Sequence, residues 1–576
     1  MKYNEQQQLA IQAEGNAIVS AGAGCGKTSV LVGRCLEKVL DENNPVSLQN
    51  ILMITFMKDA AAEMKDRIRD EINRRIEALR TQKDPGFMEK VRRLESELVH
   101  LETASICTIH SFCLKLLREH FDLFPAMGLN LGSNPIALDE SSTFILMKEA
   151  FTLVMKRHYS EDDRLRKEQN EQKEEEKGDP LVLFLRNHLD NEEATLRKML
   201  FDIYNFTQSL AYPEEWIEKQ KKLCDEDYPH HWEEMFFGAK PDEQGAFLKF
   251  LSPHGENIWG KNATPEMRSA LAEAFGHPSR ENQIALLRKF VMATKPRSGC
   301  LTTRIKNLRD KIIAILYCFG LEPEMFFDWD EVKKELTCRW NETRWVATLM
   351  LDLLDEFQAE FKRQKEFQNG LTFSDQLQFA LRLLRDPKTK EPTPIAESLR
   401  ENYHFIFVDE FQDTDSVQDA LISAIANQNR FIVGDVKQSI YRFRLANPRI
   451  FREYEEKARD RREGWNLYPL NKNYRSQADI LNFANAFFLD MMKKEVGSVE
   501  FDKNSMLEAC APPVPSEIPR VQIIWNVEDK SRSSKQQKED DASGEDLDTI
   551  EKEAILAAEK LLKLKETIRI RVDSHR

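Results

Sequence analysis

Apolar and polar positions follow two different patterns along the chain. Near the N-terminus, the apolar runs NAIVSA (16–21) and ILMITFM (51–57) each precede a charged segment with helical spacing. The run SICTIHSF (105–112) predicts a third strand and a turn, ahead of another helical segment. Because strands that alternate with helices favour a parallel sheet, residues 1–125 are expected to form an α/β domain.

The pattern changes near residue 126. Helical spacing dominates from 126 to 365, which predicts a large all-helical insertion. The charge run at 161–179, whose one apolar residue is Leu165, is expected to be a disordered loop or a solvated helix end. Apolar strands that end in acids return at 404–410 and 430–435, so the α/β character resumes there.

The C-terminal part has the same mixed character. The segment 466–500 begins NLYPLNKNYRS and continues as a predicted helix, and 520–527 predicts a further strand. The polar stretch 529–548 is expected to be disordered, and 551–565 to be helical. The predicted division is a first motor domain in two parts, 1–125 and 366–460, the insertion 126–365, and the start of a second α/β domain at 461–576.

Composition narrows the class of protein. With 576 residues, three or four domains are expected, and 41% hydrophobic with 31% charged residues is typical of a soluble globular protein. No apolar run approaches the roughly 20 residues that span a bilayer, and the N-terminus lacks a signal segment, so we expect a cytoplasmic protein without membrane contacts. The nine scattered cysteines include no C-x-x-C pair, which indicates neither a metal site nor a disulfide framework.

The net charge of −14 argues against a chain coated in basic residues for nucleic acid. It does not exclude a DNA-binding groove. Such a groove can be locally basic, or it can hold single strands by stacking bases on aromatic side chains.

The motif AGAGCGKT (21–28) follows a predicted strand and opens a predicted helix, as a phosphate-binding P-loop does. Glycines let successive backbone N–H groups curl around phosphates, aided by the helix dipole. Lys27 is expected to reach the β- and γ-phosphates of a nucleoside triphosphate, and Thr28 to ligate Mg²⁺. The alternative is a glycine-rich turn with a chance GKT. The expected nucleotide-binding residues are Ala21, Gly22, Ala23, Gly24, Cys25, Gly26, Lys27, Thr28 and Ser29.

A P-loop needs a carboxylate for Mg²⁺ at the end of another strand, and VDEFQDTD (408–415) supplies one. Asp409 is expected to bind Mg²⁺, and Glu410 to position and activate the attacking water. The alternative is an acidic strand end that caps the next helix. Since the two motifs lie far apart in sequence, a large insertion must separate them, which agrees with the helical region.

Seven motifs then occur in order: YNEQQQLAI (3–11), AGAGCGKT (21–28), ITFMKDAAAEMKDRI (54–68), TIHSFCLKLLR (108–118), VDEFQDTD (408–415), GDVKQSIYRFRLANP (434–448) and LNKNYRS (470–476). Together they resemble superfamily 1 helicases of the UvrD/RecB type. The run LANP and the segment LTFSDQL (371–377) are most similar to the N-terminal part of the AddA/RexA group of ATP-dependent helicase–nucleases. The resemblance implies a RecA-like P-loop domain that uses ATP and Mg²⁺.

The resemblance also assigns roles by matched position. It implies that Gln7 contacts the adenine, that Tyr474 lies against the adenine ring, and that Gln438 and Arg444 sense the γ-phosphate. Arg475 would act as an arginine finger, with a surface ion pair as the alternative. The side chains expected to face single-stranded DNA are Phe56, His110, Tyr441 and Phe443.

For those aromatic residues the physical reason is stacking, at about 1–3 kcal/mol per base without regard to sequence. The alternatives stay open: Phe56, Tyr441 and Phe443 can be ordinary core aromatics, and His110 a hydrogen-bonded core histidine.

The functional hypothesis is an ATP-dependent DNA helicase or translocase, 3′ to 5′ by resemblance, that acts in double-strand break repair and recombination. Its partners would be single-stranded and duplex DNA and a second helicase–nuclease subunit similar to AddB/RexB. Later helicase motifs and the nuclease motif of the group are absent from 500–576, so the chain is expected to be truncated. A catalytically incomplete fragment or a nucleotide-gated DNA-binding protein is the alternative, and a P-loop ATPase with another substrate is a third.

Overall fold

The computed structural model describes residues 3–41, 43–82, 86–169, 178–232, 329–441, 446–493, 499–514, 520–521, 558 and 560. The chain divides into two compact units. The first comprises Met1–Val19 and Thr28–Tyr468, and the second comprises Ser20–Lys27 and Pro469–Arg576. The second unit therefore includes most of the predicted phosphate loop.

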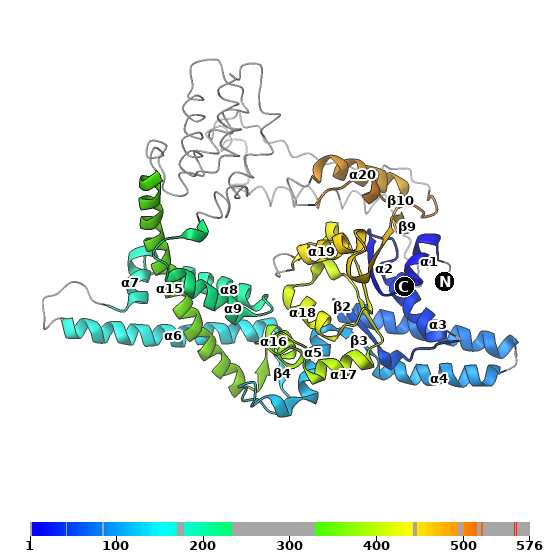
Figure 1. The fold of residues 1–576 in the computed structure, drawn as a ribbon, viewed down its shortest axis with the longest axis horizontal. Helices are drawn as coiled ribbons and strands as arrows, with labels where there is room; N and C mark the ends of the chain where they lie inside the picture. Colours follow the sequence, from blue (N-terminus) through cyan, green and yellow to red (C-terminus); the bar gives the residue numbers. More distant parts are fainter. Residues whose placement is uncertain are drawn as a thin grey trace, which may run out of the picture. The chain divides into compact units, whose positions relative to one another are not determined.

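A six-stranded sheet forms the centre of the first unit, in the order β3-β2-β6-β7-β1-β8 (Figure 1). The pairs β2–β3, β2–β6 and β6–β7 are parallel, as the alternating pattern predicts. The strands are β1 (Asn16–Ala21), β2 (Ile51–Thr55), β3 (Ser105–Thr108), β6 (Phe405–Val408), β7 (Arg430–Gly434) and β8 (Trp465–Leu470). The last residues of β1 and β8 lead into the second unit.

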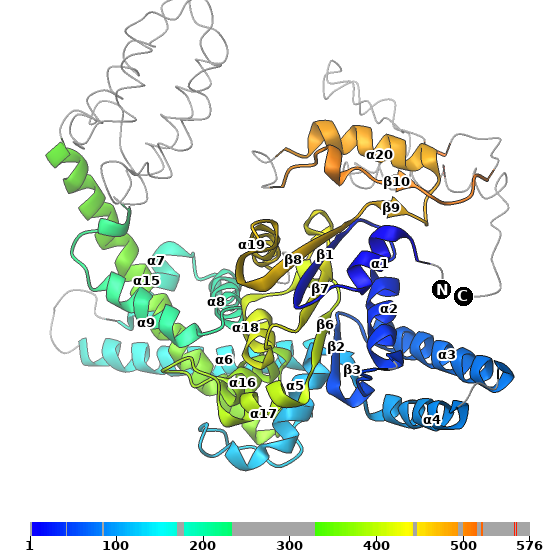
Figure 2. The ribbon, with the colours of Figure 1, turned by 45° about the vertical axis from the view of Figure 1, so that its right-hand side comes forward.

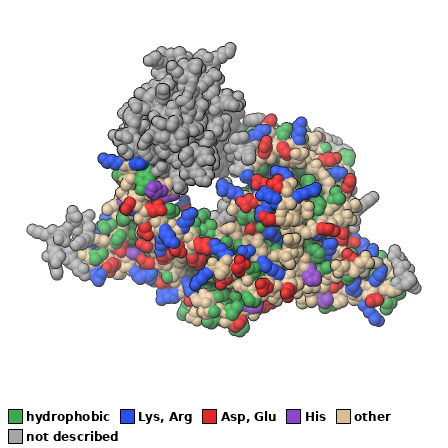
Figure 3. Space-filling view, in the orientation of Figure 1, with side chains coloured by type: hydrophobic (Ala, Val, Ile, Leu, Met, Phe, Trp, Pro, Cys, Tyr) green, Lys and Arg blue, Asp and Glu red, His purple; other side chains and the backbone are tan. Residues whose placement is uncertain are grey.

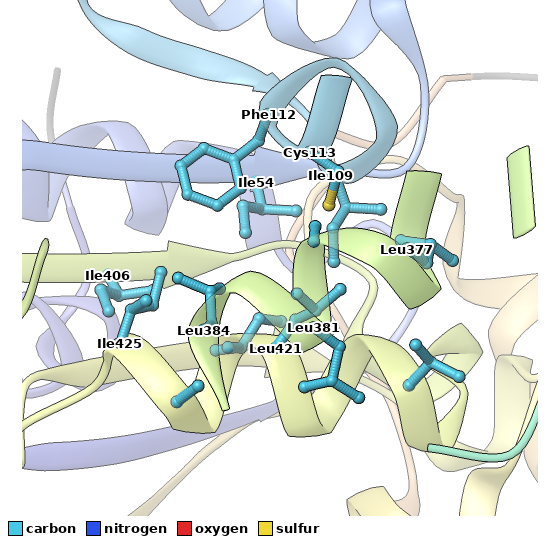
Figure 4. Packing of buried hydrophobic residues seen from close by; sticks show 14 of the residues in the cluster. Ile54, Ile109, Phe112, Cys113, Leu377, Leu381, Leu384, Ile406, Leu421 and Ile425 are labelled. Atoms are coloured by element: carbon cyan, nitrogen blue, oxygen red, sulfur yellow. The ribbon is translucent and has the colours of Figure 1, made fainter. Parts of the chain in front are cut away.

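The central strands are apolar on both faces because helices cover both. In β6, Ile406 and Val408 point into one core, which also contains Ile432 of β7 and Ile54 of β2. Figure 4 shows side chains of α5 (Ile109–Glu119), α16 (Phe373–Leu384) and α18 (Ser416–Ile425) interdigitating in that core. Continuous apolar runs are what a strand buried on both faces requires.

Other helices complete the first α/β part. Helices α3 (Lys58–Gln82) and α4 (Phe87–Thr103) run side by side and project away from the sheet in both ribbon views (Figure 2). The remaining helices are α1 (Glu5–Ile11), α2 (Lys27–Leu40), α17 (Pro394–Asn402) and α19 (Pro448–Arg459). Short 3₁₀ helices are η1 (Leu48–Asn50), η2 (Phe121–Leu123), η4 (Phe411–Asp413), η5 (Val436–Gln438), η7 (Arg462–Gly464) and η8 (Lys503–Ser505).

Between α5 and α16, the described residues form long helices with a core of their own. These are α6 (Glu140–Gln169), α7 (Pro180–His188), α8 (Glu193–Gln208), α9 (Pro213–Cys224) and α15 (Trp329–Phe367). The chain enters and leaves through a short parallel pair, β4 (Ile136–Ala137) with β5 (Gly370–Leu371). Of the predicted charge run, residues 161–169 continue helix α6, so the helix-end interpretation is confirmed for that part. Residues 233–328 lie outside the described residues.

In the second unit, β9 (Lys472–Asn473) pairs in parallel with β10 (Glu508–Ala509), and α20 (Ala478–Met491) lies between them in sequence. The predicted helix after NYRS is thereby confirmed. The strand predicted at 520–527 and the segments 529–548 and 551–565 fall almost wholly outside the described residues. Within the part of the chain that the structure describes, no helix is long and apolar enough to cross a bilayer.

Candidate nucleotide and DNA sites

The predicted phosphate loop is a glycine turn between β1 and α2. Gly24 and Gly26 have φ of +70° and +85°, in the left-handed region where residues with a Cβ are strained. A Cβ on Gly24 would lie 2.7 Å from Nδ2 of Asn473 and 2.8 Å from Cβ of Arg475. The loop therefore needs glycine at position 24 for both its backbone conformation and its close approach to the NYRS turn.

Three backbone atoms of the loop are hydrogen-bonded to the segment 470–474. Asn473 Nδ2 donates to the Ala23 carbonyl at 2.5 Å, and the Tyr474 N–H donates to the Gly24 carbonyl at 2.9 Å. The Gly22 N–H donates to the carbonyl of Leu470 at 3.2 Å. Two predicted motifs about 450 residues apart in sequence thus meet within one unit.

Asn473 is the side chain that organises this meeting. It is 1% exposed, and its Oδ1 accepts from the backbone N–H groups of Arg475 at 2.9 Å and Ser476 at 2.8 Å. The turn that results leaves the side chains of Tyr474 and Arg475 exposed. Sequence reasoning missed Asn473 because its position inside NYRS does not reveal that it binds the phosphate loop.

Lys27 is the first residue of α2, and Lys27, Thr28 and Ser29 are all half-buried. The Ser29 hydroxyl accepts from Nη1 of Arg67, on helix α3, at 3.4 Å. Lys27 belongs to the second unit, whereas Thr28 and Asp409 belong to the first. Their action on one shared nucleotide therefore stays a prediction.

The predicted acids lie where β6 ends. Asp409 is 8% exposed, and its N–H continues the sheet ladder by donating to the Ile54 carbonyl at 3.0 Å. Glu410 has φ +49° and ψ +42°, a left-handed conformation that is uncommon for a residue with a side chain. Because such conformations cost of order 1–3 kcal/mol, they concentrate at functional sites. The Glu410 N–H donates to Oδ1 of Asp409 at 3.0 Å.

Two further predicted nucleotide contacts are held by hydrogen bonds. Gln438, in η5, donates from Nε2 to Oδ2 of the buried Asp435 at 2.7 Å. Gln7 is 6% exposed and forms a capping box at the start of α1: its Oε1 accepts from the Asn4 N–H at 3.1 Å, and its own N–H donates to Asn4 Oδ1. The box fixes the orientation of the Gln7 side chain.

Two of the predicted DNA-facing aromatics form a pair. The rings of Phe56 and Tyr441 stack with centroids 5.0 Å apart and planes 29° apart, and Phe56 remains 39% exposed. Phe56 follows β2 and Tyr441 follows β7, so two different strands supply the pair. Phe443 and Arg444 lie outside the described residues.

His110 pairs with an aromatic residue that the sequence did not single out. Its ring lies 5.0 Å from that of Phe373, which is 40% exposed at the start of α16. Burial lowers the pKa of His110 to about 4, so the imidazole is neutral near pH 7 and cannot act as a cationic phosphate contact. Phe373 belongs to LTFSDQL, a motif noted only for its family resemblance.

The metal prediction agrees with the donor chemistry at hand. Among the described residues, no group of three or more His, Cys, Asp or Glu side chains is placed to hold a metal ion. Nucleotide-bound Mg²⁺ needs only one or two protein oxygens beside phosphates and water. The Thr28 hydroxyl and the Asp409 carboxylate are oxygen donors of that kind.

On the face shown in Figure 3, basic and acidic side chains of the described residues are interspersed. The negative net charge is therefore not gathered into a uniform field on that face, which is compatible with strand binding by aromatic stacking.

The sequence matches the UvrD/REP helicase N-terminal domain over residues 3–459, most of the chain. The chain belongs to the UvrD/REP helicase family. This membership confirms the resemblance drawn from the ordered motifs, and it covers the phosphate loop, the acids at 409–410 and the aromatic pair. It stops short of the NYRS turn at 473–476, which the hydrogen bonds to the loop connect to the same helicase machinery.

Curated relatives of this UvrD/REP helicase chain include proteins named as the A-type subunit of an ATP-dependent helicase/nuclease. The protein from Alkaliphilus oremlandii is 30% identical over 590 residues, which cover 97% of this chain and 45% of the relative. The protein from Anoxybacillus flavithermus is 28% identical over 573 residues, which cover 94% of this chain and 44% of the relative. The chain thus spans less than half the length of these relatives.

Proposed function

We propose that this chain is an ATP-dependent DNA helicase or translocase motor of the AddA/RexA type. The observation that carries the proposal is the pairing of a left-handed glycine phosphate loop after β1 with a left-handed Glu410 after β6, two strands of one sheet. Family membership and the printed names of the relatives support a DNA helicase over other P-loop ATPases.

In the proposed mechanism, backbone N–H groups of the loop and Lys27 hold the phosphates of ATP. Mg²⁺, held by Thr28 and Asp409, would neutralise charge on the β- and γ-phosphates. Glu410 orients a water for in-line attack on the γ-phosphorus and accepts its proton, so that the bond to the β-phosphate oxygen breaks and ADP and phosphate form.

Other side chains would tune that step. Gln7 contacts the adenine edge and Tyr474 its face, which gives preference for ATP. Arg475 stabilises charge in the transition state, as arginine fingers do. Gln438 and Arg444 respond to the γ-phosphate and connect it to the DNA site.

DNA would be held by stacking on exposed aromatic rings rather than by reading of bases. Phe56 with Tyr441, and His110 with Phe373, present such rings, and Phe443 is expected to add another. We further propose 3′ to 5′ movement, a role in double-strand break repair, and assembly with a second subunit similar to AddB/RexB, because the relatives are named as one subunit of a helicase/nuclease.

The domain interpretation is part of the same proposal. The helices between β4 and β5 would be an insertion into the first motor domain, spanning about 126–365. The region after the first unit, with β9, α20 and β10, would be the opening part of a second α/β motor domain. Two-domain motors of this family alternate closed and open states as ATP turns over.

The test is the steady-state rate of ATP hydrolysis, with and without single-stranded oligo-dT, for the native chain and Lys27→Ala. We expect stimulation by DNA, and a loss of about 10²–10³-fold in Lys27→Ala because a charge-stabilising donor is removed. Lys115→Ala, on the exposed side of α5, is the matched control and should hydrolyse ATP like the native chain. Equal rates for the native chain and Lys27→Ala would refute an ATPase. Binding of both ATP and DNA without turnover would favour the nucleotide-gated DNA-binding alternative.

A further inference from the structure

Gln412 lies two residues beyond Glu410, in the 3₁₀ helix η4, and is 2% exposed. Its Nε2 donates to Oε2 of Glu410 at 2.9 Å and to Oδ2 of Asp413 at 3.1 Å. Its Oε1 accepts from the backbone N–H of Asp435 at 2.9 Å. Both ends of this buried amide are therefore in use, one toward the hydrolytic acid and one toward the end of β7.

The segment that Gln412 contacts on the β7 side is 435–439. The Ser439 hydroxyl donates to the Gln412 backbone carbonyl at 3.3 Å, so the segment is tied to Gln412 near both of its ends. Between these ties, the carboxylate of Asp435 accepts from Lys437 Nζ and from Gln438 Nε2, each at 2.7 Å. The predicted γ-phosphate sensor thus hangs on the same residue that Gln412 holds.

Gly434 permits this close approach. A Cβ there would lie 2.5 Å from Oε1 of Gln412 and 2.9 Å from a ring carbon of Phe451, so a larger residue would push β7 and Gln412 apart. A side chain of glutamine length and a glycine opposite it are both needed for the contact.

The same segment continues to a DNA-facing aromatic. Two residues after Ser439, Tyr441 stacks on Phe56 at 5.0 Å. One side chain, Gln412, therefore stands between the acid expected to activate water and the backbone that carries Tyr441.

We propose that Gln412 is a positioning residue that couples the state of the nucleotide site at Glu410 to the DNA-facing segment 435–441. The inference rests on the proposed function, since it supposes that Glu410 serves ATP and Tyr441 serves DNA. Glutamine suits the task because its amide donates to two carboxylates while its carbonyl accepts a backbone N–H. Glutamate would place a third negative charge beside Glu410 and Asp413, and leucine would leave the Asp435 N–H without its acceptor.

Coupling of two binding sites is measured by a ratio of affinities, and it is reciprocal. The experiment measures the Kd of fluorescein-labelled oligo-dT by anisotropy, with and without Mg²⁺–ATPγS, for the native chain, Gln412→Leu and Gln418→Leu. Gln418→Leu makes the same chemical change on the half-buried surface of α18, six residues away. The ratio of the two Kd values is unaffected by a uniform loss of DNA affinity, so a merely structural role of Gln412 does not move it.

We expect ATPγS to change the Kd at least about fivefold in the native chain and in Gln418→Leu, and less than about twofold in Gln412→Leu. Ser439→Ala, which removes one hydroxyl, should reduce the nucleotide effect by about half or more. It decides the question alone if thermal unfolding shows that Gln412→Leu does not fold.

Native-like ratios in folded Gln412→Leu, or in Ser439→Ala if Gln412→Leu does not fold, would overturn the proposal. So would a native chain that binds both ligands without any mutual effect. That last result leaves the proposed binding functions intact, whereas a native chain that binds neither ATPγS nor DNA refutes the proposed function itself.

Discussion

At the scale of single residues, buried amide side chains determine how the candidate sites are held. Asn473 joins the phosphate loop to the NYRS turn through one donated and two accepted hydrogen bonds. Gln412 joins Glu410 to the end of β7 in a similar way. Neither residue is expected to touch the reacting atoms, yet each fixes the backbone of residues that are.

Asn473→Ala should weaken the binding of a fluorescent ATP analogue by about tenfold, which corresponds to about 1.4 kcal/mol. The reason is that the Ala23 carbonyl and the turn at Arg475 lose their buried partner. Asn473→Asp is the informative comparison, because it keeps the acceptor for the turn and loses the donor to the loop. Unchanged nucleotide affinity in both variants, measured by fluorescence titration, would show that the loop holds its shape without Asn473.

His110 gives a prediction about pH. Its pKa in the folded chain is about 4, below the usual value of 6.5, so between these values the folded state binds fewer protons than the unfolded state. Stability should therefore fall as the pH decreases through that window. From pH 7.5 to 5.0, the free energy of unfolding of the native chain should fall by about 2 kcal/mol more than that of His110→Phe. Urea unfolding at the two pH values measures the difference, and parallel losses would contradict a neutral His110.

At the scale of elements, α16 connects the helices of the insertion to the sheet. It packs between α5 and α18 (Figure 4), and its first residue, Phe373, meets His110. On its other side, Gln378 Nε2 donates to the Leu210 carbonyl at 2.7 Å. At its N-terminus, Asp375 accepts from Lys365 of α15 through both carboxylate oxygens at 2.7 Å, in a buried pair.

Breaking that pair should be costly. Lys365→Met leaves the Asp375 carboxylate buried without its counter-charge, and we expect a loss of about 3–5 kcal/mol in the free energy of unfolding. The double variant with Asp375→Asn should recover at least about 1 kcal/mol, because the remaining amide can still accept from the Thr372 N–H. Additive effects in urea unfolding would mean that the two side chains do not stabilise each other.

At the scale of the whole molecule, the sequence was informative where structure is local. The apolar runs before Gly22 and Asp409 predicted strands β1 and β6, and the glycines of the loop predicted its left-handed turn. Contacts between distant segments could not be predicted, because no local pattern states that Asn473 reaches Ala23 or that Gln412 reaches Asp435. Phe373 was missed for the same reason: its neighbour His110 lies far away in sequence and is brought near only by the packing of α16 on α5.

The most direct test of the central claim is hydrolysis and binding of ATP by Glu410→Gln beside the native chain, both with saturating single-stranded DNA. Because the amide cannot accept the proton of the attacking water, hydrolysis should slow by about 10²–10⁴-fold. Binding of ATP should stay within about twofold of the native value, since Glu410 is not assigned to the phosphates. A variant that hydrolyses ATP at the native rate would contradict the assignment of the acids after β6 to a helicase motor.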